Sequence, residues 1–227
     1  MTEPLAVYLE IGPKRTFAGA IEWPGWCRGA RGEEDALAAL FAYAPRYAHA
    51  VMSGGVPFTA PGSVAEFEVV EQVKGGSGTD FGVPSEAPKA DNRPLSASEL
   101  KRQSLLLQAS WDAFDAAWAK AAKAKVELRK GPRGGGRDLP KMEGHVLEAE
   151  EAYVGQLGSR HPRMPDATPA DRMAAIRETG LAALAARARG TPIADPRETQ
   201  RPWSPRYFVR RSAWHALDHA WEIEDRS

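Results

Sequence analysis

The stretch SPRYFVRRSAWHALDHAWEIEDR, residues 204–226, gives the clearest indication of the fold of the second half of the chain. Ser204 followed by Pro205 is a typical helix start, because a serine side chain caps free backbone N–H groups and proline fits the first turn. Behind this start, apolar residues recur at helical spacing: Phe208, Trp214, Leu217 and Trp221. The stretch therefore predicts a long last helix with an apolar face.

Three more helices are expected upstream, each after a recognisable start. Ser96 with Glu99 forms a capping box before a long apolar stripe. A second helix is expected over residues 140–157, and a third begins at Thr168. Because helices joined by loops bury their apolar faces against each other, the four together predict an antiparallel four-helix bundle over residues 95–227.

The first part of the chain shows the alternation of strands instead. Residues 6–11 and 16–22 alternate apolar and polar positions on either side of a Gly-Pro turn, which predicts a β-hairpin. Helical spacing predicts one helix over residues 33–51, and FEVVEQV at residues 67–73 predicts a further strand. Residues 1–75 are therefore expected to form a hairpin-helix-strand domain, and the whole chain an α+β protein.

The segment between these two parts, residues 76–94, is rich in Gly, Pro, Ser and Asp and shows no sustained period. It is expected to be a linker, either free or ordered against a domain. A second glycine-rich run, KGPRGGGRD at residues 130–138, follows no predicted strand, so it lacks the context of a phosphate-binding loop. We expect a flexible connector there.

Composition and charge exclude several classes of protein. The 30 Lys and Arg residues balance 30 Asp and Glu residues, so no overall field draws the chain to nucleic acid or an anionic membrane. The start, MTEPLAVYLEIGPKR, lacks the pattern of a signal peptide, and no uncharged apolar run reaches the roughly 18 residues of a membrane span. We expect a cytoplasmic protein without a membrane or nucleic-acid partner.

Three histidines are the candidate metal ligands. His215 and His219 lie four residues apart on the last helix, so they share a face and can bind one ion. Zinc sites need at least three protein ligands, and His145 on the second bundle helix is the best third ligand. The single cysteine, Cys27, excludes a multi-cysteine zinc motif, and Ala216 stands where a zincin has glutamate. Three imidazoles leave a coordination position open, as in catalytic sites. The alternative is that they are ordinary polar groups on helix faces.

Several charged residues lie near these histidines in the sequence. Glu148, Asp218 and Glu222 are candidates to orient an imidazole or to act as general base, and the alternative for each is a solvated surface carboxylate. Arg210 and Arg211 are candidates to receive an anionic substrate or the carboxylate of a thiol, with helix-surface arginines as the alternative.

The stretches MEGHVLEAEEAYVGQL at residues 142–157 and RRSAWHALDHAWEIEDR at residues 210–226 resemble the two metal-ligand helices of the DinB/YfiT-like superfamily. Its members are four-helix bundles in which one histidine near the start of the second helix and an HxxxH pair on the last helix bind a divalent metal, often zinc or nickel. The resemblance implies that His145, His215 and His219 bind the metal here.

The resemblance implies several possible activities, whereas it implies one set of metal ligands. Several members of the superfamily are S-transferases or isomerases that use a low-molecular-weight thiol, and others are hydrolase-like. We expect a metal-dependent enzyme that activates a low-molecular-weight thiol or water and acts on a small molecule. The alternative is a non-catalytic interaction or regulatory protein whose metal site is structural.

The stretch LEIGPKRTFAGAIEWPGWC at residues 9–27, with the acidic helix start that follows it, resembles the small HicB-like domain. In antitoxins such a domain pairs with a toxin, and elsewhere it is an interaction or lid module. The resemblance implies a protein partner bound through residues 1–75, and a homo-oligomer is a further expectation.

Overall fold

The computed structural model of the chain describes residues 4–130, 136–191 and 202–227. Its four strands are β1 (Leu5–Ile11), β2 (Thr16–Ala20), β3 (Cys27–Ala30) and β4 (Phe67–Lys74). They form one mixed sheet in the order β3-β2-β1-β4, in which β4 pairs parallel to β1 and the other pairs are antiparallel. The α+β class and the hairpin of β1 and β2 are confirmed.

Strand β3 was not expected from the sequence. Its four residues, CRGA, are too few to show alternation, and the turn of Trp23 to Trp26 before it contains Pro24 and Gly25. Gly25 has φ +90 and lies against the last helix, where an added Cβ would be 2.9 Å from Leu217 Cδ1. Only glycine fits this turn without strain, because it adopts a positive φ and lets the two backbones approach.

The single helix expected over residues 33–51 is wrong. The structure has α1 (Glu33–Ala42) and α2 (Ala44–Ser53), with Tyr43 between them. Pro45 lies in the first turn of α2, where its missing N–H and fixed φ are tolerated, and it does not fit the interior of a helix. The period of the apolar residues continues across the break, so periodicity alone does not reveal it.

The segment over residues 76–94 is ordered against the sheet and the last helix. It contains α3 (Ser77–Phe81) and a 3-10 turn, η2 (Lys89–Asn92). Glu10 on β1 is buried and accepts hydrogen bonds from Thr79 Oγ1 at 2.5 Å and from the backbone N–H groups of Ser85 and Glu86 at 3.0 and 3.2 Å. A buried carboxylate must be hydrogen-bonded, so these contacts hold the segment in place.

Four long helices make up the second half of the described structure: α4 (Ala97–Lys123), α5 (Leu139–Gln156), α6 (Pro169–Ala188) and α7 (Pro205–Arg226). Their expected start signals are confirmed, since the side chains of Ser96, Thr168 and Ser204 each accept a hydrogen bond from a backbone N–H of the first turn. Of the connector expected at residues 130–138, residues 131–135 lie outside the described part.

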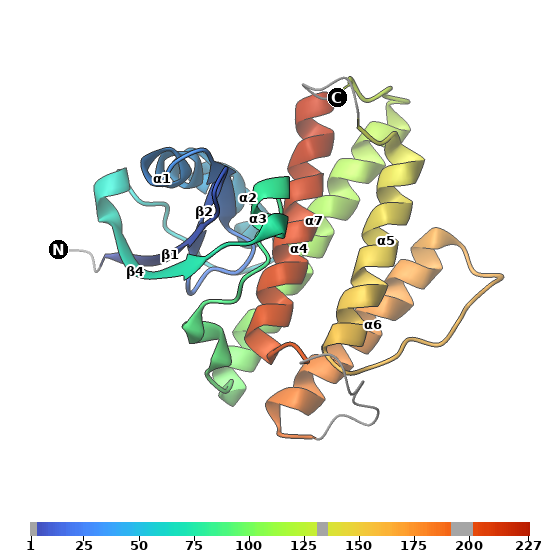
Figure 1. Cartoon of the computed structure of the whole chain (residues 1–227). Coiled ribbons are helices and arrows are strands. Elements are labelled where there is room, and N and C mark those ends of the chain that lie inside the picture. The colour runs from blue at the N-terminus through green and yellow to red at the C-terminus, as the bar shows by residue number, and fades with distance from the viewer. Residues whose placement is uncertain (1–3, 131–135, 192–201) are drawn as a thin grey trace.

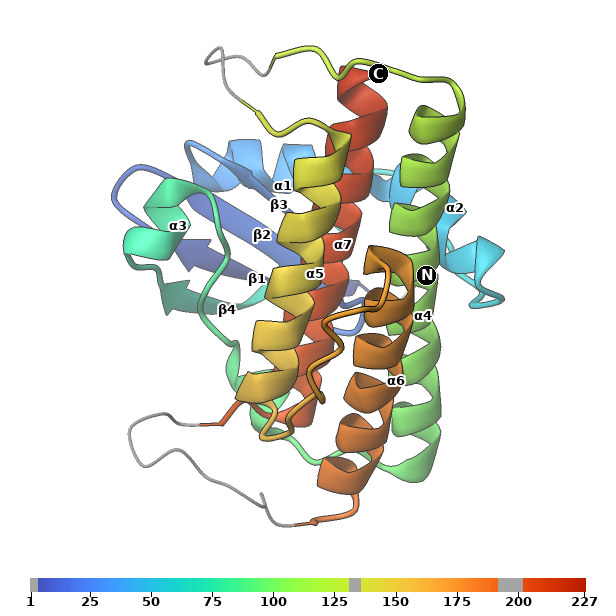
Figure 2. The same ribbon diagram turned by 90° about the vertical axis from the view of Figure 1, so that its right-hand side faces the viewer.

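The directions of these helices do not simply alternate. Helices α4 and α7 run one way, and α5 and α6 run the other way (Figures 1 and 2). The consecutive helices α5 and α6 are therefore parallel, because the chain between Leu157 and Thr168 returns along the bundle before α6 begins. Among helices consecutive in the chain, the expected antiparallel arrangement therefore holds for α4 with α5 and for α6 with α7, and is wrong for α5 with α6.

Helix α7 lies between the sheet layer and the other three long helices (Figure 1). On one side, small residues such as Ala213, Ala216 and Ala220 pack into the cluster that α4, α5 and α6 share. On another side, Leu217 and Trp221 pack with the core of the sheet, α1 and α2. Two residues of the apolar stripe that predicted α7, Leu217 and Trp221, therefore face the sheet layer. Because both layers pack against it, α7 is buried on nearly all sides. In the described part of the chain, no helix has the length and apolar character needed to span a membrane.

Candidate metal centre

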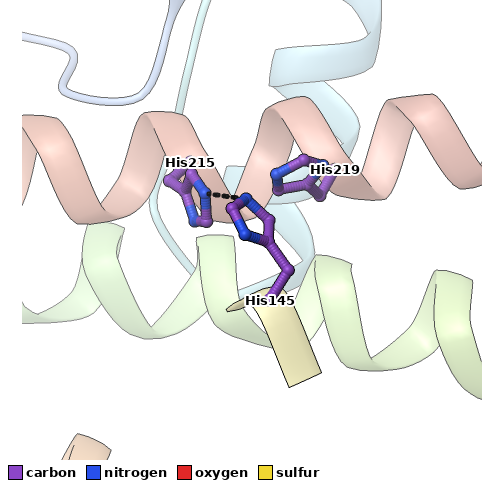
Figure 3. Close-up of side chains that lie close together, drawn as sticks. All are labelled: His145, His215 and His219. Atoms are coloured by element: carbon purple, nitrogen blue, oxygen red, sulfur yellow. Dashed lines mark hydrogen bonds between the residues drawn. The ribbon is translucent and has the colours of Figure 1, made fainter. Parts of the chain in front are cut away.

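The three candidate histidines meet where α5 crosses α7. Figure 3 shows His145 from α5 reaching towards His215 and His219 on α7. The Nε2 atoms of His145 and His215 lie 3.2 Å apart, and one ligand atom from each of the three rings lies within 4.8 Å of the others. His215 and His219 are 6% and 8% exposed, and His145 is partly exposed. The three residues that the sequence selected are therefore brought together.

The protonation of two of these rings suits metal binding. Burial lowers the pKa of His145 to about 4, helped by the nearby charges of Arg137 and His219 and opposed by Glu222. Burial also lowers the pKa of His215 well below its ordinary value. Both rings are therefore neutral near pH 7, and a neutral imidazole has the free lone pair that binds a metal.

Glu222 sets the orientation of His219. The Nδ1 atom of His219 lies 2.9 Å from one carboxylate oxygen of Glu222, and Arg226 donates to the other oxygen at 2.6 Å. Burial alone would raise the pKa of Glu222, but the hydrogen bonds and charges of His219 and Arg226 outweigh it and lower that pKa. A carboxylate on Nδ1 fixes the proton there and leaves Nε2 of His219 free for a metal, as in many zinc sites.

Replacement of Glu222 by glutamine is expected to weaken zinc binding by about tenfold, because the ring of His219 loses a charged partner while the side-chain shape is kept. Glu222→Ala should cost more, up to about 100-fold. Competition with a chromophoric chelator measures both affinities. Glu148→Gln is the matched control and should leave the affinity unchanged, since Glu148 is exposed on α5. Equal affinities for the Glu222 and Glu148 variants would show that Glu222 does not support the site.

The other two candidate carboxylates are not partners of the histidines in the described structure. Asp218 pairs with Arg28 of β3 at 2.7 Å and so links α7 to the sheet. Glu148 is exposed, and the cluster of metal-binding groups contains only the three histidines. Of the three carboxylates selected from the sequence, Glu222 alone touches a candidate ligand.

Two further residues of the centre were missed. Arg226 orients Glu222, and the spacing of four residues between them was the signal that could have shown it. The ring of Tyr153 on α5 lies 5.6 Å from that of His215, centroid to centroid, and forms a wall of the centre. No signal in the sequence indicated Tyr153 at this place, because contacts between two helices do not follow from the period of either one.

The adjacent arginines Arg210 and Arg211 have opposite environments. Arg210 is 6% exposed, pairs with Asp91 through Nε at 2.6 Å and Nη2 at 2.8 Å, and also donates to the backbone oxygens of Ala20 and Ile21. Four of its five N–H donors are thus used and its charge is paired with a buried carboxylate, so Arg210 is a structural residue. Arg211 makes no ion pair with any carboxylate of the described ranges.

Histidine ligands in this arrangement fit a divalent ion such as zinc or nickel, which imidazole nitrogens suit well. The donor set supplies three of the four ligands of a tetrahedral site, and the partly exposed His145 marks the side from which a fourth ligand can approach.

Comparisons with known proteins identify no family for this chain. No family model, no curated protein and no solved structure matches the chain. The resemblances to the DinB/YfiT-like superfamily and to the HicB-like domain therefore stay predictions.

Proposed function

We propose that this chain is a divalent-metal-dependent enzyme in which His145, His215 and His219 bind the ion. The observation that carries the proposal is the approach of three imidazole nitrogens to within 4.8 Å of one another from two helices. Helix period explains the pair on α7, but the convergence of His145 on that pair requires tertiary packing. His145 and His215 are neutral near pH 7, and the lone pairs of neutral imidazoles are the groups that bind a cation.

The reaction class we propose is the transfer or hydrolysis of a small molecule, with a low-molecular-weight thiol or water as nucleophile. A bound divalent ion would lower the pKa of a thiol or of water and so supply a nucleophile near neutral pH. Within the chain, His145, His215 and His219 hold the ion, and Glu222 keeps the ring of His219 in its binding orientation. His215 and His219 themselves lie on the buried part of α7, with 6% and 8% of their surfaces exposed.

Membership of the DinB/YfiT-like superfamily is part of this proposal. It is supported by the order of the ligands, with one histidine early in α5 and an HxxxH pair on α7. For the HicB-like part, we propose that the sheet with α1 and α2 is an interaction module for a protein partner or a second copy of the chain. Its sheet contains the expected hairpin and the later strand β4.

Removal of the metal tests the enzymatic proposal. The purified protein should contain about one zinc or nickel ion per chain, and chelation should lower thiol conjugation to a small electrophile, or hydrolysis of a small ester, by at least about tenfold. Addition of zinc or nickel should restore the activity. A protein that purifies with metal and loses thermal stability on chelation, but shows no turnover with any thiol or ester, would instead support the structural metal site of a regulatory protein.

A further inference from the structure

Three buried nitrogen atoms without a protein hydrogen-bond partner belong to neighbouring positions on α7. They are Nη1 of Arg211, Nε1 of Trp214 and Nδ1 of His215. Positions three and four apart share a helix face, so the three side chains start from the same face of α7. Buried donors without a partner are uncommon in folded proteins, because each has lost its hydrogen bond to water. A cluster of them beside a candidate metal centre indicates a place for an acceptor.

The guanidinium of Arg211 is held by aromatic rings. Its central carbon lies 4.6 Å from the ring centroid of Trp214 and 5.3 Å from that of Tyr153. Contacts with ring faces fix the plane of a guanidinium and leave its N–H edges available. No carboxylate in the described part of the chain pairs with Arg211, whereas the charge of its neighbour Arg210 is paired with Asp91. The positive charge of Arg211 is thus held in place by the two rings and the Tyr153 hydroxyl, and its Nη1 edge has no protein partner and can bind an anion.

This charge lies beside the histidine centre. Tyr153 contacts both Arg211 and His215. Its ring lies 5.6 Å from the ring of His215, centroid to centroid, and its hydroxyl is close enough to interact with Arg211. Arg211 and His215 are four residues apart, which places their backbones just over one helical turn, roughly 6 Å, from each other along α7. A ligand of a few carbon atoms can therefore touch Arg211 and reach the histidine centre at once.

We infer that Arg211 and Trp214 form a carboxylate-binding subsite next to the three histidines, which recognises a small acid whose other end reaches the metal. One guanidinium and one indole N–H match the single charge and two oxygens of a carboxylate better than the double charge of a phosphate monoester. The inference deepens the proposed function, on which it rests for the role of the metal. It names the class of the thiol or substrate: a small carboxylic acid.

The test compares two thiols that differ in one group, 3-mercaptopropionate and 3-mercapto-1-propanol. Each is titrated into the whole 227-residue chain without added metal, and the indole N–H resonance of Trp214, assigned with a Trp214→Phe variant, reports binding. The acid should shift this resonance and the alcohol should not. Arg211→Gln should weaken binding of the acid by about tenfold or more, as expected when a charged hydrogen bond is lost.

Arg189→Gln is the matched control, because it removes the same charge at an exposed position at the end of α6 and should leave the titration unchanged. Equal shifts with the acid and the alcohol, or an Arg211→Gln variant that binds the acid as the wild type does, would overturn the inference. Inorganic phosphate that displaces the acid at equal concentration would show that the ligand class is wrong. Unchanged unfolding midpoints for both variants separate loss of binding from loss of fold.

The same titration in the zinc-loaded protein separates this inference from the proposed function. If the protein binds no metal but Trp214 still responds to the acid in an Arg211-dependent way, the metal proposal fails and the carboxylate subsite stands. If metal binds and the acid has no advantage over the alcohol, the subsite fails and the metal proposal stands.

Discussion

Single replacements of His145, His215 or His219 by alanine are expected to remove the metal from the protein. Each leaves two imidazoles, and two ligands do not hold a divalent ion against dialysis. The loss of affinity should exceed the roughly 10- to 100-fold that changes to supporting residues cost. Elemental analysis after dialysis should find about one ion per chain in the wild type and less than about a tenth of that in each variant.

Exposed His49 on α2 provides the control for this series, since His49→Ala also removes an imidazole but far from the centre. Zinc should raise the unfolding temperature of the wild type and of His49→Ala, because an ion that binds only the folded state stabilises it. It should have no such effect on the three variants. Stoichiometric metal in all three variants would eliminate the histidine site.

The second large effect concerns stability. Arg210→Met is expected to lower the free energy of unfolding by about 3–5 kcal/mol, because it leaves the carboxylate of Asp91 buried without its partner. Asp91 is 1% exposed, and burial of the pair is what makes it costly to break. Burial alone would lower the pKa of Arg210, but the charge and hydrogen bonds of Asp91 outweigh it and raise that pKa, so Arg210 stays charged. Urea unfolding measures the loss.

Arg211→Met, one residue further, is the matched control and should change the unfolding free energy by less than about 1 kcal/mol. The double variant Arg210→Met with Asp91→Leu should recover part of the stability, since no unpaired charge remains. Recovery stays partial because the backbone oxygens of Ala20 and Ile21 also lose their donor. Equal destabilisation by the Arg210 and Arg211 replacements would contradict the environments described for them.

The start of each long helix could be predicted from the sequence, because helix caps are local. Ser96, Thr168 and Ser204 bond backbone groups only three residues away, so the residues that form each cap are adjacent in the sequence. The pair of His215 and His219 is local in the same sense, since the helical period alone puts both on one face.

Other parts of the fold could not be predicted in this way. The break at Tyr43 falls within a continuous apolar period, and β3 is too short to alternate. The directions of α5 and α6 depend on how the chain between them runs, for which composition gives no signal. The face of α7 that meets the sheet carries Leu217 and Trp221, and nothing in their spacing separates a bundle core from a sheet layer.

For the candidate site, the helical pattern was enough to select the histidines and to assign each to a helix. The convergence of His145 on the other two, their support by Glu222 and not by Asp218 or Glu148, and the pairing of Arg210 but not Arg211 with a carboxylate all follow from the packing of the chain. The physical reason is distance along the chain. The helical period relates residues a few positions apart, whereas Arg210 and Asp91 are separated by 119 positions, and only packing brings such partners together.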